Sequence, residues 1–204
     1  MKILNGHCGL GGNRQLWEGH EITAVEINPK IAEIYQDTFP NDTVIIGDFH
    51  QYLLDHHNEY DFIWSSPPCP THSDARRMGV HRGQNDAVYP DMKLYEEIIL
   101  LRHFYKLEGL YCVENVKPYY EPLLTPQIRG RHCFWSNFYI HEYNKETDNI
   151  GGMTNEIGIK KTGVDLDAYG YTGRKDKIYR NYMSPQLGKH ILDSATKNIQ
   201  EKLF

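Results

Sequence analysis

The residue in this sequence with the clearest capacity for chemistry is a cysteine enclosed by prolines. Cys69 lies between Pro68 and Pro70, shortly after the acidic and apolar run 61–64. Proline has no backbone N–H, so these residues end the expected strand and restrict the turn that follows it. Most cysteines are small core residues, but a rigid turn at a strand end can hold a thiol as a nucleophile. We therefore treat Cys69 as a candidate nucleophile.

Other strand ends carry compatible groups. Glu114 and Asn115 follow the apolar run 110–113 and place a carboxylate and an amide at the end of a later strand. The first expected strand, 2–6, leads into the glycine-rich turn Gly9-Leu10-Gly11-Gly12. Glycine lets the backbone approach a ligand closely, so this turn is a candidate cofactor-binding segment.

Two further acids end apolar runs. Glu26 closes 21–26, where nucleotide-binding α/β folds use an acid to accept hydrogen bonds from ribose hydroxyls. A solvated glutamate is the alternative. Asp48 closes 43–48 and could cap the next helix or accept from an adenine amino group. Phe49 or Ile27 would then pack on the adenine ring.

The elements that must position these groups alternate along the chain. Strands are expected over 2–6, 21–26, 43–48, 61–64 and 110–113, with a strand-like run over 134–138. Helices are expected over about 13–17, from 28, over 91–107 and from 184. This order predicts an α/β fold with a doubly wound, mostly parallel sheet, in which ligands bind at the carboxyl ends of the strands.

The polar stretch 74–89 shows neither a helical nor a strand period, so we expect a long loop. Such a loop in a compact domain is usually functional, and Arg76, Arg77 and Arg82 suit contact with phosphate. A solvated surface loop is the alternative.

Composition, net charge and cysteine spacing indicate which classes of protein the chain fits and which are unexpected. The chain has 204 residues, of which 40% are hydrophobic and 24% charged, which fits a globular domain. The net charge of −5 counts against a stable nucleic-acid-binding protein, but not against an enzyme that binds DNA transiently. Four cysteines without CxxC spacing make a metal site unexpected. No run reaches membrane-spanning length, and we expect a cytoplasmic protein.

Several motifs, taken in order, resemble those of the cytosine-5 DNA methyltransferases. They are Pro67-Pro68-Cys69 with Ser73, then Glu114-Asn115-Val116, then Gln127-x-Arg129-x-Arg131. The stretch 7–12 is similar to the family's first motif, and 180–185 to its last. The family usually has an aromatic residue where His7 stands and a glycine where Arg180 stands. The shortness of the chain resembles phage-encoded members.

The resemblance implies S-adenosylmethionine as cofactor, double-stranded DNA as substrate and flipping of the target base. Cys69 would attack carbon 6 of cytosine, Glu114 would act at ring nitrogen 3, and Arg131, with Arg129, would hold the ring's carbonyl oxygen. The implied cofactor-binding residues are Cys8, Gly9, Leu10, Gly11, Gly12, Glu26, Ile27, Asp48, Phe49, Pro68 and Asn181. The implied nucleic-acid-binding residues are Ser73, Arg76, Arg77 and Arg82. A restriction partner is compatible with this interpretation.

The resemblance also divides the chain. Residues 1–138 would form the catalytic and cofactor-binding core, 139–183 a reduced target-recognition region, and 184–204 a C-terminal helix packing back on the core. Three alternatives remain: an RNA cytosine methyltransferase, an amino-group methyltransferase, and a non-catalytic DNA- or cofactor-binding protein. Cys69 argues against the second, whose turn carries an aromatic residue after Pro-Pro. The set of Cys69, Glu114 and Arg131 argues against the third.

Overall fold

The computed structural model describes residues 1–143 and 153–202, and for 198–202 only the helical backbone. The strands are β1 (Lys2–Gly6), β2 (Glu21–Glu26), β3 (Thr43–Ile46), β4 (Phe62–Ser65), β5 (Leu110–Val116), β6 (Gln127–Arg129) and β7 (His132–Ser136). The helices are α1 (Pro29–Thr38), α2 (Phe49–His56), the short 3-10 helix η1 (His57–Glu59), α3 (Asp74–His81), α4 (Lys93–Phe104), α5 (Asn155–Thr162), α6 (Lys175–Asn181) and α7 (Pro185–Lys202).

The strands form one sheet in the order β3-β2-β1-β4-β5-β7-β6. Strands β1 to β5 are parallel, whereas β7 runs antiparallel to both β5 and β6. The predicted doubly wound, mostly parallel α/β fold is therefore confirmed, as a Rossmann-like sheet with an antiparallel edge. The carboxyl ends of the parallel strands meet at one edge, where the predicted chemistry lies.

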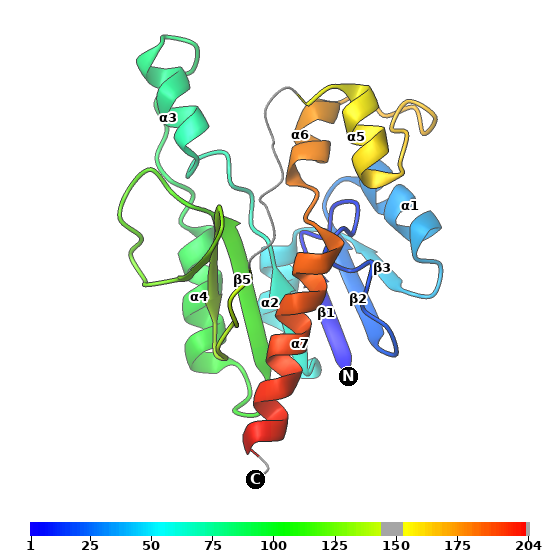
Figure 1. Ribbon diagram of the computed structural model, residues 1–204, viewed down its shortest axis with the longest axis vertical. Coiled ribbons are helices and arrows are strands. Elements are labelled where there is room, and N and C mark those ends of the chain that lie inside the picture. Colours follow the sequence, from blue (N-terminus) through cyan, green and yellow to red (C-terminus); the bar gives the residue numbers. More distant parts are fainter. Residues whose placement is uncertain (144–152, 203–204) are drawn as a thin grey trace.

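Helices cover both faces of the sheet, which is why its central strands are apolar on both sides (Figure 1). On one face, α7 buries Leu187, Ile191 and Ala195 against side chains such as Phe62 and Trp64. On the other face, α2 and α4 enclose a second cluster that includes Leu4, Phe49, Leu53, Ile63, Leu94, Ile98 and Val113.

The pair α5 and α6 packs on α1 above the strand ends (Figure 1). Tyr179 of α6 is fully buried among Leu10, Ile31 and Ile34, and its hydroxyl donates to the carbonyl of Val164 at 3.1 Å. Residues 153–183 therefore form a small helical layer above the carboxyl ends of the parallel strands (Figure 1).

Two sequence-based expectations were wrong. Residues 13–17 form turns instead of a helix, and the Trp17 indole is buried, donating to the carbonyl of Gly188 at 3.2 Å. The stretch 74–89 begins with helix α3, which projects at the top of the molecule (Figure 1). Gly79 is the one α3 residue classed as buried, so the helix lacks the apolar stripe that reveals helices in sequence.

In the part of the chain that the structure describes, every helix is too short or too polar to cross a bilayer.

Candidate active site

The glycine turn begins immediately after β1 and bends sharply. Gly9 and Gly11 have positive φ angles of 53° and 71°, a conformation that suits glycine. A Cβ on Gly12 would lie 2.3 Å from the carbonyl oxygen of Met183, so the turn and the segment before α7 approach as closely as backbones can. This contact joins the first strand end to the residues that follow α6.

Glu26 stands beside this turn at the end of β2. Its Oε2 accepts from the backbone N–H of Gly9 at 3.1 Å, and its Oε1 accepts from that of Asn28 at 2.9 Å. Both oxygens are thereby fixed in direction and retain lone pairs for a further donor. A carboxylate held in this way can receive paired hydroxyls.

Cys69 lies in the turn after β4, and Asn115 fixes that turn from β5. The Asn115 amide donates to the carbonyl of Pro67 at 3.0 Å, while its oxygen accepts from the N–H of Val116 at 2.9 Å. Burial and the negative charge of Glu114 raise the pKa of Cys69 to about 11, while Arg131 and Lys177 act in the opposite direction. The thiol is therefore mostly protonated at neutral pH.

Glu114 has a partner that the sequence analysis did not identify. His132, the first residue of β7, brings its Nδ1 to 2.6 Å from Glu114 Oε1. Both side chains are mostly buried, with 12% and 11% of their surfaces exposed. The signal in the sequence was a histidine directly after Arg131, but its meaning depends on the pairing of β5 with β7.

One cavity of about 270 Å³ joins these groups. Of the predicted residues, it is lined by Cys8, Gly9, Leu10, Gly12, Glu26, Ile27, Pro68, Cys69, Glu114, Arg131 and Asn181. The glycine turn and Glu26 thus share a cavity with the candidate nucleophile and acid. Gly11, Asp48, Phe49, Arg129, Ser73, Arg76, Arg77 and Arg82 are not among its lining residues.

Phe49 and Asp48 have other partners in the structure and do not line the cavity, so their roles at the cofactor stay predictions. The ring of Phe49 is 1% exposed and lies 4.9 Å from the ring of His7, centroid to centroid. Asp48 caps α2 by accepting from the N–H of His50 at 2.9 Å, and pairs with Lys93 at 3.1 Å. Capping was one of the two roles expected of Asp48, and it leaves Ile27 as the predicted adenine neighbour that lines the cavity.

Arg129 does not line the cavity either, and its contacts are with the chain after β7. Its guanidinium donates to the carbonyls of His141, at 3.0 Å, and of Ile140, and lies over the ring of Tyr139. These contacts fasten the chain after β7 to β6. The structure therefore gives Arg129 a structural role and leaves Arg131 at the cavity.

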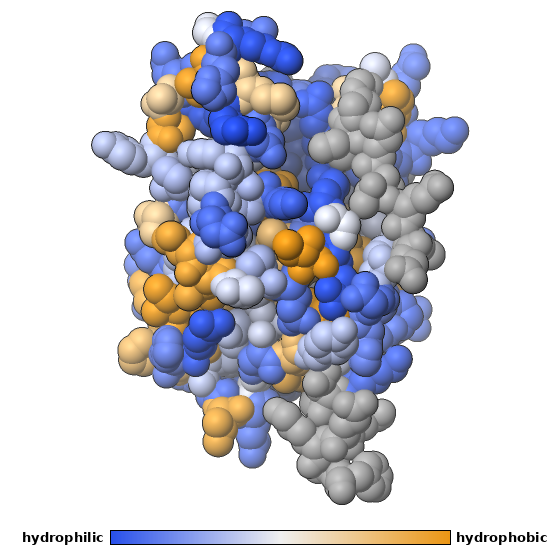
Figure 2. Space-filling model, turned by 60° about the vertical axis from the view of Figure 1, so that its left-hand side comes forward, coloured by the Kyte–Doolittle hydropathy of each residue, from blue (hydrophilic) through white to orange (hydrophobic). Residues whose placement is uncertain are grey.

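The four residues predicted to contact nucleic acid lie on or beside α3. Ser73 caps the helix by accepting from the N–H of Arg76. Arg76 donates to the carbonyl of Asp86 at 2.8 Å, and Arg77 pairs with Asp74 at 2.8 Å. Arg82 follows the helix and is exposed. At the top of the molecule, where Figure 1 places α3, hydrophilic side chains lie together with some hydrophobic ones (Figure 2).

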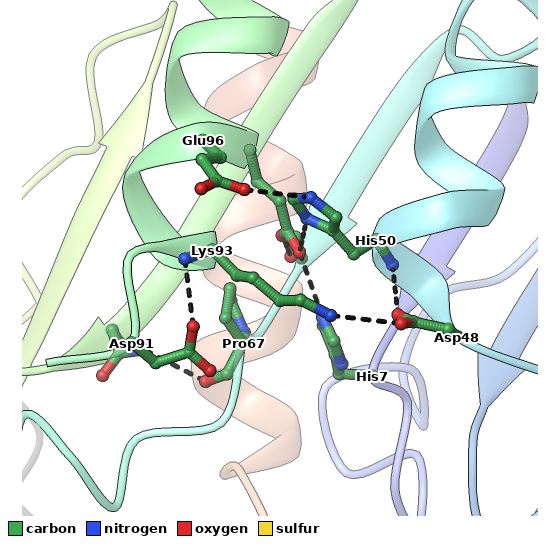
Figure 3. A network of polar contacts seen from close by, with 10 residues as sticks. His7, Asp48, His50, Pro67, Asp91, Lys93 and Glu96 are labelled. Atoms are coloured by element: carbon green, nitrogen blue, oxygen red, sulfur yellow. Dashed lines mark hydrogen bonds and ion pairs between the residues drawn. The ribbon is translucent and has the colours of Figure 1, made fainter. Parts of the chain in front are cut away.

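A buried carboxylate connects His7, which lines the cavity, with His50 in the polar network of Figure 3. Glu97 of α4 is 1% exposed and accepts from the Ser65 hydroxyl at 2.5 Å, with His7 Nε2 and His50 Nδ1 each at 3.4 Å. Burial opposes its charge, but the hydrogen bonds from His50 and His7 hold the pKa of Glu97 below its usual value. His7, with a φ of 51°, is thereby fixed at the cavity wall.

Comparisons with known proteins bear on this site. Residues 1–118 match the family model described as C-5 cytosine-specific DNA methylase. No curated protein matches the chain.

Three solved structures resemble part of the chain. A Pyrococcus horikoshii protein is 19% identical over 56% of this chain and 49% of its own, with a TM-score of 0.40. A TehB-like SAM-dependent methyltransferase from Corynebacterium glutamicum is 17% identical over 56% and 54%, with a TM-score of 0.37. A candidate DNA modification methyltransferase from a prophage of Escherichia coli is 17% identical over 59% and 33%, with a TM-score of 0.38. The chain thus spans between a third and about half of these proteins.

Proposed function

Because the chain belongs to the C-5 cytosine-specific DNA methylase family, we propose that it transfers a methyl group from S-adenosylmethionine to carbon 5 of cytosine in double-stranded DNA. The reaction passes through a covalent bond between Cys69 and a flipped base. The observation that carries this proposal is the single cavity in which Cys69, Glu114 and Arg131 share walls with the glycine turn and Glu26.

The residues at the glycine turn fit the cofactor. The carboxylate of Glu26 is held by two backbone N–H groups and suits the ribose hydroxyls, and exposed Ile27 offers an apolar surface to adenine. Asn181 and Pro68 line the same cavity. When bound, S-adenosylmethionine supplies an electrophilic methyl group.

The other residues of the cavity activate the base. Carbon 5 of cytosine is a poor nucleophile in the aromatic ring. When the Cys69 thiolate attacks carbon 6, the ring becomes an enamine that is nucleophilic at carbon 5. Glu114 delivers a proton to nitrogen 3 as charge develops there, and Arg131 holds the carbonyl oxygen. Asn115 supports the turn that carries Cys69, through its bond to Pro67.

A cytosine within a duplex cannot reach a cavity of this kind, so the base must leave the stack. We assign the contacts with DNA to α3 and the residues on either side of it, 73–82, which we call the α3 arm. The contacting side chains would be those of Ser73, Arg76, Arg77 and Arg82. Residues 139–183 would serve as the reduced target-recognition region, residues 1–138 as the catalytic and cofactor-binding core, and α7 as the helix that closes the core.

Trapping with 5-fluorocytosine tests the reaction. The adduct resolves only when the hydrogen on carbon 5 leaves as a proton, and fluorine cannot leave as a cation. Duplex DNA containing 5-fluorocytosine should therefore form a complex that survives denaturing electrophoresis and yields a crosslinked peptide containing Cys69.

Cys69→Ala should form no complex and transfer no methyl group, yet still bind the cofactor. A complex through Cys8, Cys112 or Cys133, or methyl transfer by Cys69→Ala, would overturn the assignment. A complex with tRNA in place of duplex DNA would identify the protein as an RNA methyltransferase.

A further inference from the structure

The pairing of β5 with β7 places a histidine against the proposed acid. Glu114 lies opposite Phe134 and Val116 lies opposite His132. Glu114 and His132 are therefore diagonal neighbours on the same face of the antiparallel pair. Their side chains meet at 2.6 Å between Nδ1 and Oε1, and both line the cavity that contains Cys69.

This contact is short and shielded from bulk water. With 12% and 11% of their side chains exposed, His132 and Glu114 form a charge-assisted hydrogen bond in a site that bulk water hardly reaches. Among the described residues, Glu114 has no second side-chain partner in a hydrogen bond. Its other oxygen is therefore available to a ligand in the cavity.

We propose that His132 is a positioning residue that supplies Glu114 with the proton delivered to ring nitrogen 3. This inference rests on the proposed function. The pair can share one proton in two ways. The proton is either on His132, as an imidazolium beside a carboxylate, or on Glu114, as a carboxylic acid beside a neutral imidazole. In the second form, Glu114 can donate to the base, whereas a bare carboxylate would repel the lone pair of nitrogen 3.

The Cys69 thiol first loses its proton to solvent, and the sulfur electron pair then forms the bond to carbon 6. The electrons of the C5–C6 double bond move toward carbon 4, and those of the C4–N3 double bond move to nitrogen 3. Nitrogen 3 takes the proton from Glu114, which leaves imidazole and carboxylate. The proton returns to solvent when the sulfur–carbon bond breaks.

The same proton acts on the nucleophile. The negative charge of Glu114 is one of the causes that raise the pKa of Cys69. A proton on Glu114 removes that charge at the stage when the thiolate must form. The other titratable or charged groups around the pair are Cys69, Cys112, Cys133, Lys117, Arg131 and Lys177.

The test measures the rate of adduct formation on 5-fluorocytosine DNA between about pH 6 and 9. In the wild type the thiolate is favoured by rising pH and the proton on the pair by falling pH, so we expect a maximum. Asparagine offers an N–H near the position of Nδ1 but cannot carry an extra proton. His132→Asn should lose the descending limb and slow the reaction at pH 7 by about 10- to 100-fold, less than the roughly 10²–10⁴-fold of a general acid.

A matched control is His190→Asn, because His190 of α7 bonds to the carbonyl of His141 and does not line the cavity. It should keep the wild-type profile. Cofactor binding measured by calorimetry should be unchanged in His132→Asn, which separates loss of proton supply from loss of fold. If His132→Asn keeps the wild-type profile, the inference is overturned and the proposed function stands.

A double variant provides a second readout. In Glu114→Gln, residue 114 can no longer pass a proton from His132 to the base. Adding His132→Asn should therefore change the rate of adduct formation by less than about twofold. A further loss near that of the single variant would overturn the inference, because His132 would then act independently of Glu114. If the wild type itself forms no adduct, the failure lies with the proposed function.

Discussion

In the proposed reaction, Cys69 must lose its proton before it attacks the base, and its surroundings oppose that loss. Burial and the charge of Glu114 raise its pKa to about 11, against the opposing effect of Arg131 and Lys177. The resting thiol is thereby protected from adventitious reaction. In the proposed reaction, activation of the thiol requires that the charge of Glu114 be neutralised when DNA enters the cavity.

Alkylation of Cys69 by iodoacetamide should follow this pKa. Because the thiolate is the reactive form, the rate should rise about tenfold for each pH unit between about pH 7 and 10. Glu114→Gln removes a charge that raises the pKa and should speed alkylation at pH 8, whereas Arg131→Gln should slow it. Mass spectrometry can assign the modified residue, with Cys69→Ala as the control. A rate independent of pH over this range would contradict the raised pKa.

Substitution of Glu26 tests the part of the cavity that is proposed to bind the cofactor. If its carboxylate receives the ribose hydroxyls, Glu26→Ala should weaken binding of S-adenosylmethionine by about 1.5–3 kcal/mol, the scale of a charge-assisted hydrogen bond. Glu21→Ala, an exposed change at the start of β2, is the matched control. Equal affinities of Glu26→Ala and wild type in calorimetry would remove Glu26 from the site.

At the scale of elements, the cavity depends on a close contact between two distant segments. The turn after β1 touches the residues between α6 and α7, where a Cβ on Gly12 would lie 2.3 Å from the Met183 carbonyl oxygen. The two segments that resemble the family's first and last motifs therefore meet here through backbone, and any side chain at Gly12 would separate them.

Gly12→Ala should destabilise the protein by about 1–3 kcal/mol, the usual cost of overpacking. Gly47→Ala is the matched control, because nothing lies within 4 Å of its added Cβ and its φ is ordinary. That variant should be neutral or gain up to about 1 kcal/mol through a less flexible unfolded chain. Urea unfolding of both variants provides the measurement. Equal midpoints would show that the segment containing Met183 moves aside without loss of stability.

Elements with a strong pattern could be predicted from the sequence. Helix α1 has an asparagine cap and a proline at its first turn, and α7 has an apolar stripe, so both were expected. Helices α3, α5 and α6 were not, because they are short and bury few side chains; their stability comes from caps such as Ser73 and Thr154 and from packing of α6 on α1. In the sequence, Ser73 could have indicated the start of α3, because serine is a preferred residue at the N-cap of a helix.

The site shows the same division. Residues at strand ends, such as Glu26 and Cys69, could be placed at one edge because parallel strands end together. His132 could not, since its meeting with Glu114 depends on the register of β5 with β7, which separation in sequence does not reveal. His7 was noticed as a departure from the family, but its partner Glu97 lies 90 residues away on α4.

At the scale of the whole molecule, the proposed binding of DNA by a chain with a net charge of −5 requires local basic residues. The α3 arm is the proposed place. Arg77→Ala and Arg82→Ala should each weaken DNA binding and reduce the slope of log affinity against log salt by about 1, if each side chain contacts one phosphate. Lys106→Ala, which removes a cation paired with Asp61 near the start of β4, should leave the slope unchanged. Equal slopes in all three variants would remove α3 from the DNA interface.

The region proposed to read the target is small, and much of it is occupied in holding itself together. Between residues 139 and 183, α5 and α6 have eight and seven residues. Tyr179 is fully buried, and a Cβ on Gly158 would lie 2.1 Å from its ring, so the two helices press on each other. Residues 144–152 of this region lie outside the part of the chain that the structure describes. Among its described residues, the outward side chains of α5 and α6 remain for recognition of bases.

This small surface limits the length of the target. Each bidentate contact with a base contributes roughly 1–3 kcal/mol of discrimination, so a few contacts specify about two to four base pairs. Bisulfite sequencing of DNA from cells that express the protein should therefore find 5-methylcytosine in a short or degenerate site, with Cys69→Ala as the blank. Methylation confined to one site of about six or more fixed bases would need more contacts than these helices offer. It would show that target recognition lies elsewhere than in residues 139–183.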